Sequence, residues 1–253
     1  MDLENKYGAL DYQQKVLAMM KDVHVFLSKN GIKYSLCGGS LLGAIRENGF
    51  IPWDDDLDMM MDRENFNKFL SVCDDSEKIE GYVVSRMLWI YRVQRKDEYN
   101  GSLTGATLDI FVIDKVPGSK IKQRLKIFLI KLLQGTMRKY RNIENYSFIN
   151  RVRLRVTYFI GMPFSKETKF RMYTKVSQIG KNSNSGLVGC YNGLFSHLPI
   201  VYDDNLLKET VLHKFEDAEF FVTSEYDSYL TNLYGDYMTP PPVEERKPQH
   251  TSL

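Results

Sequence analysis

The run Asp54-Asp55-Asp56-Leu57-Asp58 carries the clearest potential for chemistry in this chain. Side chains alternate between the two faces of a strand, so Asp56 and Asp58 project from the same face if the run leads into one. Two carboxylates about 4 Å apart repel by roughly 4 kcal/mol at an effective dielectric near 20, and a divalent cation removes that repulsion. The run therefore predicts a site for Mg²⁺ or Mn²⁺ in phosphate chemistry, with Asp56 and Asp58 as ligands. A helix cap or a solvated acidic loop is the alternative, and it applies best to Asp54 and Asp55.

A third carboxylate, Asp109, lies inside the apolar segment from Leu108 to Ile113. A lone carboxylate in such a buried strand is costly unless it is paired or bound to a metal. We expect Asp109 on a strand next to Asp56 and Asp58, as a third metal ligand. A salt bridge to an arginine or lysine is the open alternative.

The triplet Gly38-Gly39-Ser40 is placed between an expected strand and a short helix, sixteen residues before Asp56. Backbone N–H groups at a helix start can hold a phosphate when no Cβ is in the way. Arg46 follows Ser40 by six residues, and its planar guanidinium could reach the same phosphates. The alternatives are an ordinary turn and a surface arginine.

The hydrophobic periodicity predicts the elements that must position these residues. Helices are expected at 10–27 and 63–73, and strands at 32–37, 57–61, 82–95 and 107–113. The C-terminal part predicts a hairpin or edge strand at 214–222 and a helix at 224–234 with Ser224 as its N-cap. The fold class is α/β (α+β): a mixed sheet flanked by helices, with an added basic helical region.

Basic residues are concentrated in the middle of the chain. The stretch 115–175 holds sixteen basic and two acidic residues, a local charge of +14 in a chain of net charge +2. We divide the chain into a catalytic core at 1–118, a basic helical region at 119–210 and a C-terminal segment at 211–253 that completes the core. Residues 120–133 form a basic amphipathic helix, which either contacts an anionic membrane surface or packs on the core. No nucleic-acid-binding motif accompanies the charge.

The bulk composition is that of a folded globular protein, with 43% hydrophobic and 26% charged residues. The three cysteines, Cys37, Cys73 and Cys190, match neither a disulfide framework nor a zinc knuckle. The polar first residues lack a signal core, and no apolar run reaches the roughly 18 residues that span a bilayer. We expect a cytoplasmic protein, with the inner face of the membrane as its place of contact.

Two adjacent segments, 38–46 and 49–58, resemble the signature of the LicD family. The segment 233–238, with Pro240 to Pro242 and His250, is similar to the family's C-terminal signature. The family includes bacterial phosphocholine transferases and the fukutin-like proteins, and its core resembles the nucleotidyltransferase fold.

The resemblance implies transfer of phosphocholine or a phospho-alditol from a CDP-linked donor to a sugar hydroxyl. The acceptor would be a lipid-linked cell-surface glycan of the teichoic acid, capsule or lipopolysaccharide kind. By position, Asp56, Asp58 and Asp109 would bind metal, and Asp109 would also be the general base. Donor contacts would come from Gly38, Gly39, Ser40, Arg46 and Trp53, and further substrate contacts from Asp54, Tyr234 and His250.

Two other functions share these residues. A nucleotidyltransferase would use the same metal site but break a different phosphate bond, and a binding module would keep the fold without turnover. Release of CMP indicates the first function, whereas release of pyrophosphate indicates nucleotidyl transfer.

Overall fold

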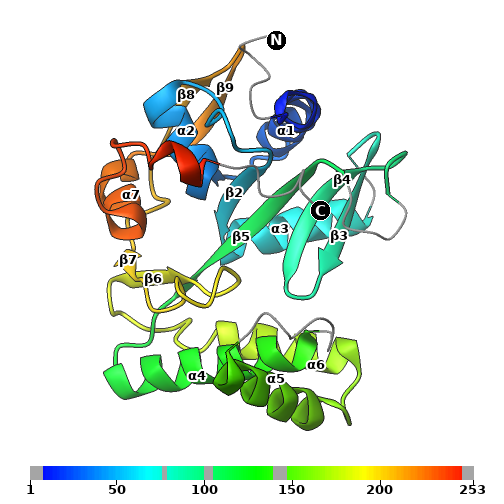
Figure 1. Cartoon of the computed structure of the whole chain (residues 1–253), viewed down its shortest axis with the longest axis vertical. Coiled ribbons are helices and arrows are strands. Elements are labelled where there is room, and N and C mark those ends of the chain that lie inside the picture. Colours follow the sequence, from blue (N-terminus) through cyan, green and yellow to red (C-terminus); the bar gives the residue numbers. More distant parts are fainter. Residues whose placement is uncertain (1–7, 76–78, 100–104, 139–146, 247–253) are drawn as a thin grey trace. The chain divides into compact units, whose positions relative to one another are not determined.

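The computed structural model describes residues 8–75, 79–99, 105–138 and 147–246, and it has the predicted α/β fold with a mixed sheet (Figure 1). The chain forms two compact units. The first unit comprises Met1–Ser85, Tyr91–Ile113 and Asp204–Leu253, and the second comprises Arg86–Ile90 and Asp114–Asp203. Each unit is therefore built from more than one stretch of the sequence.

The sheet of the first unit places two strands that carry acidic residues side by side. The main path of the sheet comprises β1 (Ser35–Leu36), β2 (Leu57–Asp62), β3 (Tyr82–Met87), β4 (Ile90–Arg95) and β5 (Thr107–Lys115), in the order β1-β2-β5-β4-β3. β2 runs parallel to β5, while β1 is antiparallel to β2 and β4 is antiparallel to β5. The predicted strands at 57–61 and 107–113 are thus confirmed, and they are central.

The apolar side chains of β2 and β5 explain this central position. Leu57, Met59, Met60 and Met61 of β2 are fully buried, as is Leu108 of β5. Near-continuous apolar runs are typical of strands covered on both faces. An acidic residue placed in such a strand is surrounded by low-dielectric material, and this matters for the site.

Four α-helices belong to the first unit: α1 (Leu10–Lys29), α2 (Gly38–Glu47), α3 (Arg63–Asp75) and α7 (Tyr226–Tyr234). A short 3₁₀ helix, η2, covers Val243–Glu245. α1 buries residues at helical spacing, among them Val16, Met20, Val23 and Leu27. α2 begins at Gly38, so the triplet that was expected to precede this short helix is its first turn.

The C-terminal part of the chain returns to the first unit. β8 (Thr210–Phe215) and β9 (Ala218–Thr223) form an antiparallel hairpin, which confirms the predicted hairpin and starts it earlier. The Thr223 N–H donates to Ser35 Oγ of β1 at 2.8 Å, so the hairpin is bonded to β1. Ser224 as the cap of α7 is wrong, because Glu225 occupies the N-cap position and Ser224 Oγ donates to the Glu209 carbonyl at 3.4 Å.

The second unit contains the basic residues. Its elements are α4 (Lys120–Met137), α5 (Phe148–Gly161), α6 (Lys166–Ser177), β6 (Leu187–Cys190) and β7 (Tyr202–Asp203). α4 packs against both α5 and α6 (Figure 1). A Cβ on Gly161 would lie 2.6 Å from Thr136 Cβ, so glycine is needed where α5 approaches α4. The sequence predicts helices here, but β6 and β7 were not predicted.

The helix at 120–133 does not bury and expose its side chains as the sequence pattern predicted. Ile121, Leu125 and Phe128 are exposed, whereas Lys126 is fully buried. The Lys126 ammonium donates to the Lys115 carbonyl at 2.9 Å and lies 3.6 Å from the centre of the Tyr191 ring. Lys126 is therefore part of the core and not of the basic surface. No helix of the described residues is long and apolar enough to span a membrane.

Candidate active site

The acidic run lies where a loop enters β2. The loop conformation is fixed from α1, because Gln13 Nε2 donates to the Asp54 carbonyl at 2.7 Å. The Asp54 N–H in turn donates to the Ile51 carbonyl at 2.8 Å. Asp56 directly precedes β2 and Asp58 is its second residue, so their side chains leave the strand on the same face.

The strand register then brings in two more charged residues. Asp58 of β2 is the direct neighbour of Asp109 in β5, and Asp109 is the direct neighbour of Arg92 in β4. Arg92 Nη2 donates to Asp109 Oδ2 at 2.8 Å, and Arg92 Nε lies 2.5 Å from Asp109 Oδ1. Both side chains are about one-tenth exposed. The salt bridge that the sequence left open for Asp109 is therefore present, and its partner is Arg92.

The first turn of α2 packs directly against the carboxylates. Gly38 has a φ of 56°, and a Cβ there would lie 3.3 Å from Asp58 Oδ2. A Cβ on Gly39 would lie 2.5 Å from Asp54 Oδ2. Glycine is therefore favoured at position 38 by its left-handed conformation, and at position 39 by the close approach of Asp54. The positive end of the helix dipole points at these carboxylates and stabilises their charge.

Ser40 has a structural role that the sequence did not predict. Its Oγ accepts a hydrogen bond from the Asp58 N–H at 2.7 Å, and the Cys37 N–H donates to the Asp58 carbonyl at 3.1 Å. Both backbone groups of Asp58 are therefore bound to the segment that starts α2. The role of Ser40 in holding donor phosphate remains a prediction for its backbone N–H.

The side chain of Asp58 is buried among several other carboxylates. Burial raises its pKa well above the usual range, the charges of Asp56, Asp109 and Asp54 raise it further, and Arg92 opposes them. Burial and the neighbouring Asp56 and Asp55 raise the pKa of Asp54 to about 8. One guanidinium group faces this set of carboxylates, so the site favours an added cation.

The residues fit a magnesium ion that shares its ligands with a substrate. No group of three His, Cys, Asp or Glu side chains in the described part of the chain is arranged as a metal site. Mg²⁺, however, is usually held by one or two carboxylates, with water and substrate phosphate completing the octahedron. Asp56 and Asp58 supply that number from one strand face. Asp109, as a third ligand, stays a prediction because Arg92 binds both of its oxygens.

Four predicted site residues remain, and each has a different environment. The Tyr234 hydroxyl lies near the first turn of α2, since its Oη would lie 3.9 Å from a Cβ on Gly38. Arg46 Nη1 donates to the Tyr237 carbonyl at 3.0 Å, and its buried Nη2 has no hydrogen-bond partner in the described residues. Trp53 packs under the guanidinium of Arg246, 5.0 Å from the ring centre. His250 lies outside the described residues.

Two residues of the site were missed from the sequence. Arg92 lies in a strand whose pattern gave no sign of a charged partner, and only the register reveals it. Tyr229 of α7 accepts a hydrogen bond at its hydroxyl from the Gly38 N–H at 3.3 Å. The helical spacing of α7 marks Tyr229 as a buried residue, but nothing local links it to Gly38.

The family of this chain follows from comparison with known proteins. The family model described as LicD/FKTN/FKRP, nucleotidyltransferase domain, matches residues 31–128, which include α2, the acidic run and β5. The chain is 30% identical to the lipopolysaccharide cholinephosphotransferase LicD of Haemophilus influenzae over 263 aligned positions, covering 95% of each chain. The chain therefore belongs to the LicD family.

Two other relatives share a shorter segment. An uncharacterized protein of Rickettsia prowazekii is 38% identical over 97 residues, which cover 38% of this chain and 32% of that one. An uncharacterized protein of Rickettsia typhi is 33% identical over 97 residues, which cover 38% of this chain and 28% of that one. The extent of the Haemophilus match, in contrast, includes both units of the structure.

Proposed function

We propose that this protein transfers phosphocholine from CDP-choline to a sugar hydroxyl of a lipopolysaccharide-type glycolipid. The observation that carries the proposal is the carboxylate cluster of Asp54, Asp56 and Asp58 against the first turn of α2. The full-length similarity to a lipopolysaccharide cholinephosphotransferase supports the choice of transferred group and acceptor.

The proposed reaction is a displacement at the phosphorus atom that bears choline. The acceptor hydroxyl oxygen forms a new bond to this phosphorus, and the bond from the phosphorus to the oxygen of CMP breaks. The hydroxyl proton passes to a base, and CMP leaves with the bonding electron pair. The products are a phosphodiester on the sugar and free CMP.

In this proposal Asp56 and Asp58 bind Mg²⁺ or Mn²⁺ through their carboxylates. The bound ion would neutralise phosphate oxygens and stabilise the charge that develops on CMP. The two carboxylates would also orient the donor, because the backbone of Asp58 is fixed by Ser40 and Cys37. Such fixed ligands reduce the reorganisation that the reaction requires.

Asp109 is the proposed general base for the acceptor hydroxyl. The Arg92 guanidinium pairs with Asp109 and fixes the carboxylate in one orientation. A carboxylate has about four lone-pair sites, so binding to Arg92 leaves acceptor capacity for a hydroxyl proton.

The first turn of α2 is the proposed phosphate site. The first N–H groups of a helix lack intrahelical partners, and the Gly38 N–H is bound to the Tyr229 hydroxyl. The N–H groups of Gly39 and Ser40 are therefore the proposed donors to the phosphates. The unpartnered Nη2 of Arg46 and the hydroxyl of Tyr234 are the proposed additional contacts.

A donor screen tests this function. Purified protein with Mg²⁺ is heated with CDP-choline, CDP-ribitol, CDP-glycerol or CTP, and the midpoint of thermal unfolding is measured. We expect CDP-choline to raise the midpoint most, because a ligand that binds only the folded state stabilises it. Stabilisation by CTP alone would favour nucleotidyl transfer, which the description of the matched family model makes the second candidate. No response to any nucleotide would favour a binding module.

A further inference from the structure

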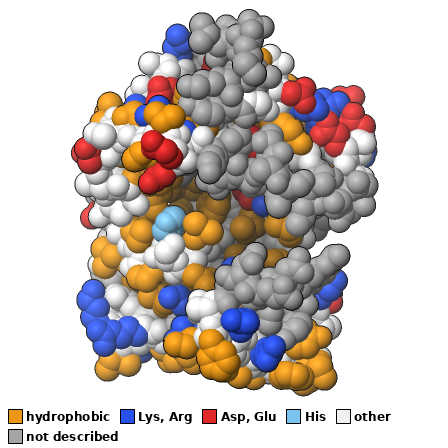
Figure 2. Space-filling model, in the orientation of Figure 1, with side chains coloured by type: hydrophobic (Ala, Val, Ile, Leu, Met, Phe, Trp, Pro, Cys, Tyr) orange, Lys and Arg blue, Asp and Glu red, His pale blue; other side chains and the backbone are white. Residues whose placement is uncertain are grey.

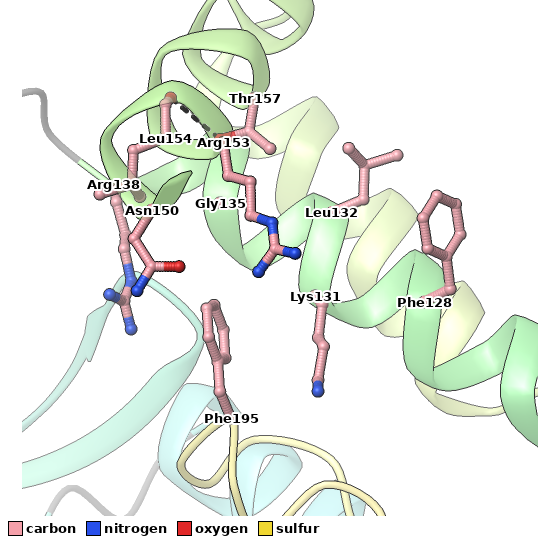
Figure 3. Close-up of a pocket in the computed structure, with 10 residues that line it drawn as sticks. All are labelled: Phe128, Lys131, Leu132, Gly135, Arg138, Asn150, Arg153, Leu154, Thr157 and Phe195. Carbon is pink, nitrogen blue, oxygen red and sulfur yellow. Dashed lines mark hydrogen bonds between the residues drawn. The ribbon is translucent and has the colours of Figure 1, made fainter. Parts of the chain in front are cut away.

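A cavity of about 510 Å³ lies within the second unit, between α4, α5 and the loop that carries Phe195 (Figure 3). It differs from the carboxylate cluster in composition, because none of the described residues that line it is acidic. Its lining is mainly basic and apolar. This combination indicates a ligand with two chemically different parts.

Three basic residues line the cavity: Lys131 of α4, Arg138 directly after α4, and Arg153 of α5. Figure 3 shows the guanidinium group of Arg153 extending from α5 toward the side on which Phe195 lies. The Arg138 guanidinium lies 4.6 Å from the centre of the Phe195 ring. Within the part of the chain that the structure describes, no salt bridge joins any of the three to a carboxylate. Three uncompensated cations around one cavity favour an anionic ligand, and arginine forks match the oxygens of a phosphate.

The rest of the lining is mainly apolar: Phe128, Leu132, Leu154 and Phe195. The apolar surface continues beyond the cavity on α5, where Phe148 is 74% exposed and Phe159 is 65% exposed. Figure 2 shows hydrophobic side chains beside lysine and arginine side chains in the region of α4 and α5, at the bottom of the view. Exposed apolar surface of this kind, bordered by basic residues, is typical of contact with anionic lipid.

We propose that this cavity binds the phosphate group of an anionic lipid, with the lipid chain on Phe128, Leu132 and Leu154. A free anion would leave the apolar lining unused, and a neutral lipid would leave the three cations unpaired. The inference rests on the proposed function for one point, the identity of the natural ligand. That ligand would be the phosphorylated lipid anchor of the glycolipid acceptor.

Calorimetric titration of the full chain with dihexanoyl phosphatidic acid, below its micelle concentration, tests the site directly. The comparison ligands are dihexanoyl phosphatidylcholine, which carries no net charge, and inorganic phosphate, which has no chain. We expect one molecule of the phosphatidic acid to bind per chain, at least tenfold more tightly than either comparison ligand. The experiment needs no turnover, so failure of the transfer reaction would not affect it.

A pair of double variants separates the cavity from general surface charge. Lys131→Gln with Arg153→Gln removes two cations that line the cavity. Lys122→Gln with Arg155→Gln removes two exposed cations from the same two helices, neither of which lines it. We expect the first pair to weaken phosphatidic acid binding at least tenfold, and the second pair to change it less than threefold.

Three results would overturn the proposal. Equal weakening by the two pairs would mean that surface charge alone attracts the lipid. Inorganic phosphate binding as tightly as the phosphatidic acid would indicate a site for free phosphate. Retained binding in a Lys131→Gln, Arg153→Gln protein with an unchanged unfolding midpoint would place the lipid elsewhere.

Discussion

Asp58 combines a backbone that is held by two hydrogen bonds with a carboxylate that is buried among other carboxylates. Its N–H and carbonyl are both bound to the start of α2, so its carboxylate leaves the strand in one direction. Burial and three neighbouring carboxylates raise its pKa. A carboxylate whose charge is energetically costly and whose orientation is fixed is typical of a functional position.

Replacing Asp58 by Asn should separate function from stability. The amide removes the charge that Asp56, Asp109 and Asp54 oppose, so we expect an unfolding midpoint equal to or above that of the wild type. Transfer of phosphocholine should fall at least about a hundredfold, since one ligand of the proposed cation is lost. Turnover and thermal unfolding are measured on the same preparation.

The matched control is Asp217→Asn, the same substitution at an exposed residue. Asp217 pairs with Lys21 on the surface at 2.7 Å, and such exposed pairs contribute little to stability because water screens them. We expect its turnover to match the wild type. An Asp58→Asn protein with full turnover would remove Asp58 from the proposed site.

The pair of Arg92 and Asp109 makes a second prediction at this scale. Arg92→Met should lower the free energy of unfolding by about 3 kcal/mol, because it leaves a buried carboxylate without its counter-charge. Adding Asp109→Leu should restore most of that loss. Denaturant unfolding of both variants measures it, and a loss below about 1 kcal/mol in the single variant would mean that Asp109 has another partner.

At the scale of elements, the sequence pattern predicted the helices and strands whose positions are set by buried apolar residues. β2, β5 and α1 follow from their apolar residues, and the acidic run was correctly placed at the entrance of β2. The neighbours of these elements did not follow. That Arg92 faces Asp109 depends on strand register, and that Tyr229 reaches Gly38 depends on a contact between residues 191 positions apart. β6 and β7 are too short for a periodic signal.

The junction of α2 and β2 carries the prediction that belongs to this scale. Ser40→Ala removes the acceptor of the Asp58 N–H and leaves that group without its partner in the site. We expect a loss of about 1–3 kcal/mol in the free energy of unfolding. Denaturant unfolding measures this loss.

Ser228→Ala is the control, because Ser228 is an exposed residue of α7. It should change the free energy of unfolding by less than about 0.5 kcal/mol. If Ser40→Ala weakened only donor binding and left stability unchanged, the hydroxyl would serve the phosphate and not the strand.

At the scale of the whole molecule, the two units differ in charge and in proposed task. The first unit holds the carboxylate cluster, and the second holds most of the basic stretch of 115–175. The charge difference is visible in the sequence, whereas the assignment of 86–90 to the second unit depends on a tertiary contact of Trp89 with the core of that unit. One unit is suited to a cation with a nucleotide, the other to an anionic amphiphile.

Removing divalent cations should therefore affect only one of these tasks. With EDTA in excess we expect loss of phosphocholine transfer and of stabilisation by CDP-choline, both restored by Mg²⁺. Binding of dihexanoyl phosphatidic acid should be unchanged, because basic side chains and no carboxylates line that cavity. Transfer that persists in EDTA would contradict the cation site.

Identification of the nucleotide product is the most direct measurement of the central claim. The protein is incubated with Mg²⁺, CDP-choline labelled in the choline group and a lipopolysaccharide acceptor, and the products are separated by chromatography. We predict that CMP and labelled acceptor form in equal amounts, and that neither forms with the Asp58→Asn protein. If the acceptor stayed unlabelled and no CMP formed, the result would contradict a phosphocholine transferase. Release of pyrophosphate when CTP replaces CDP-choline would contradict it as well.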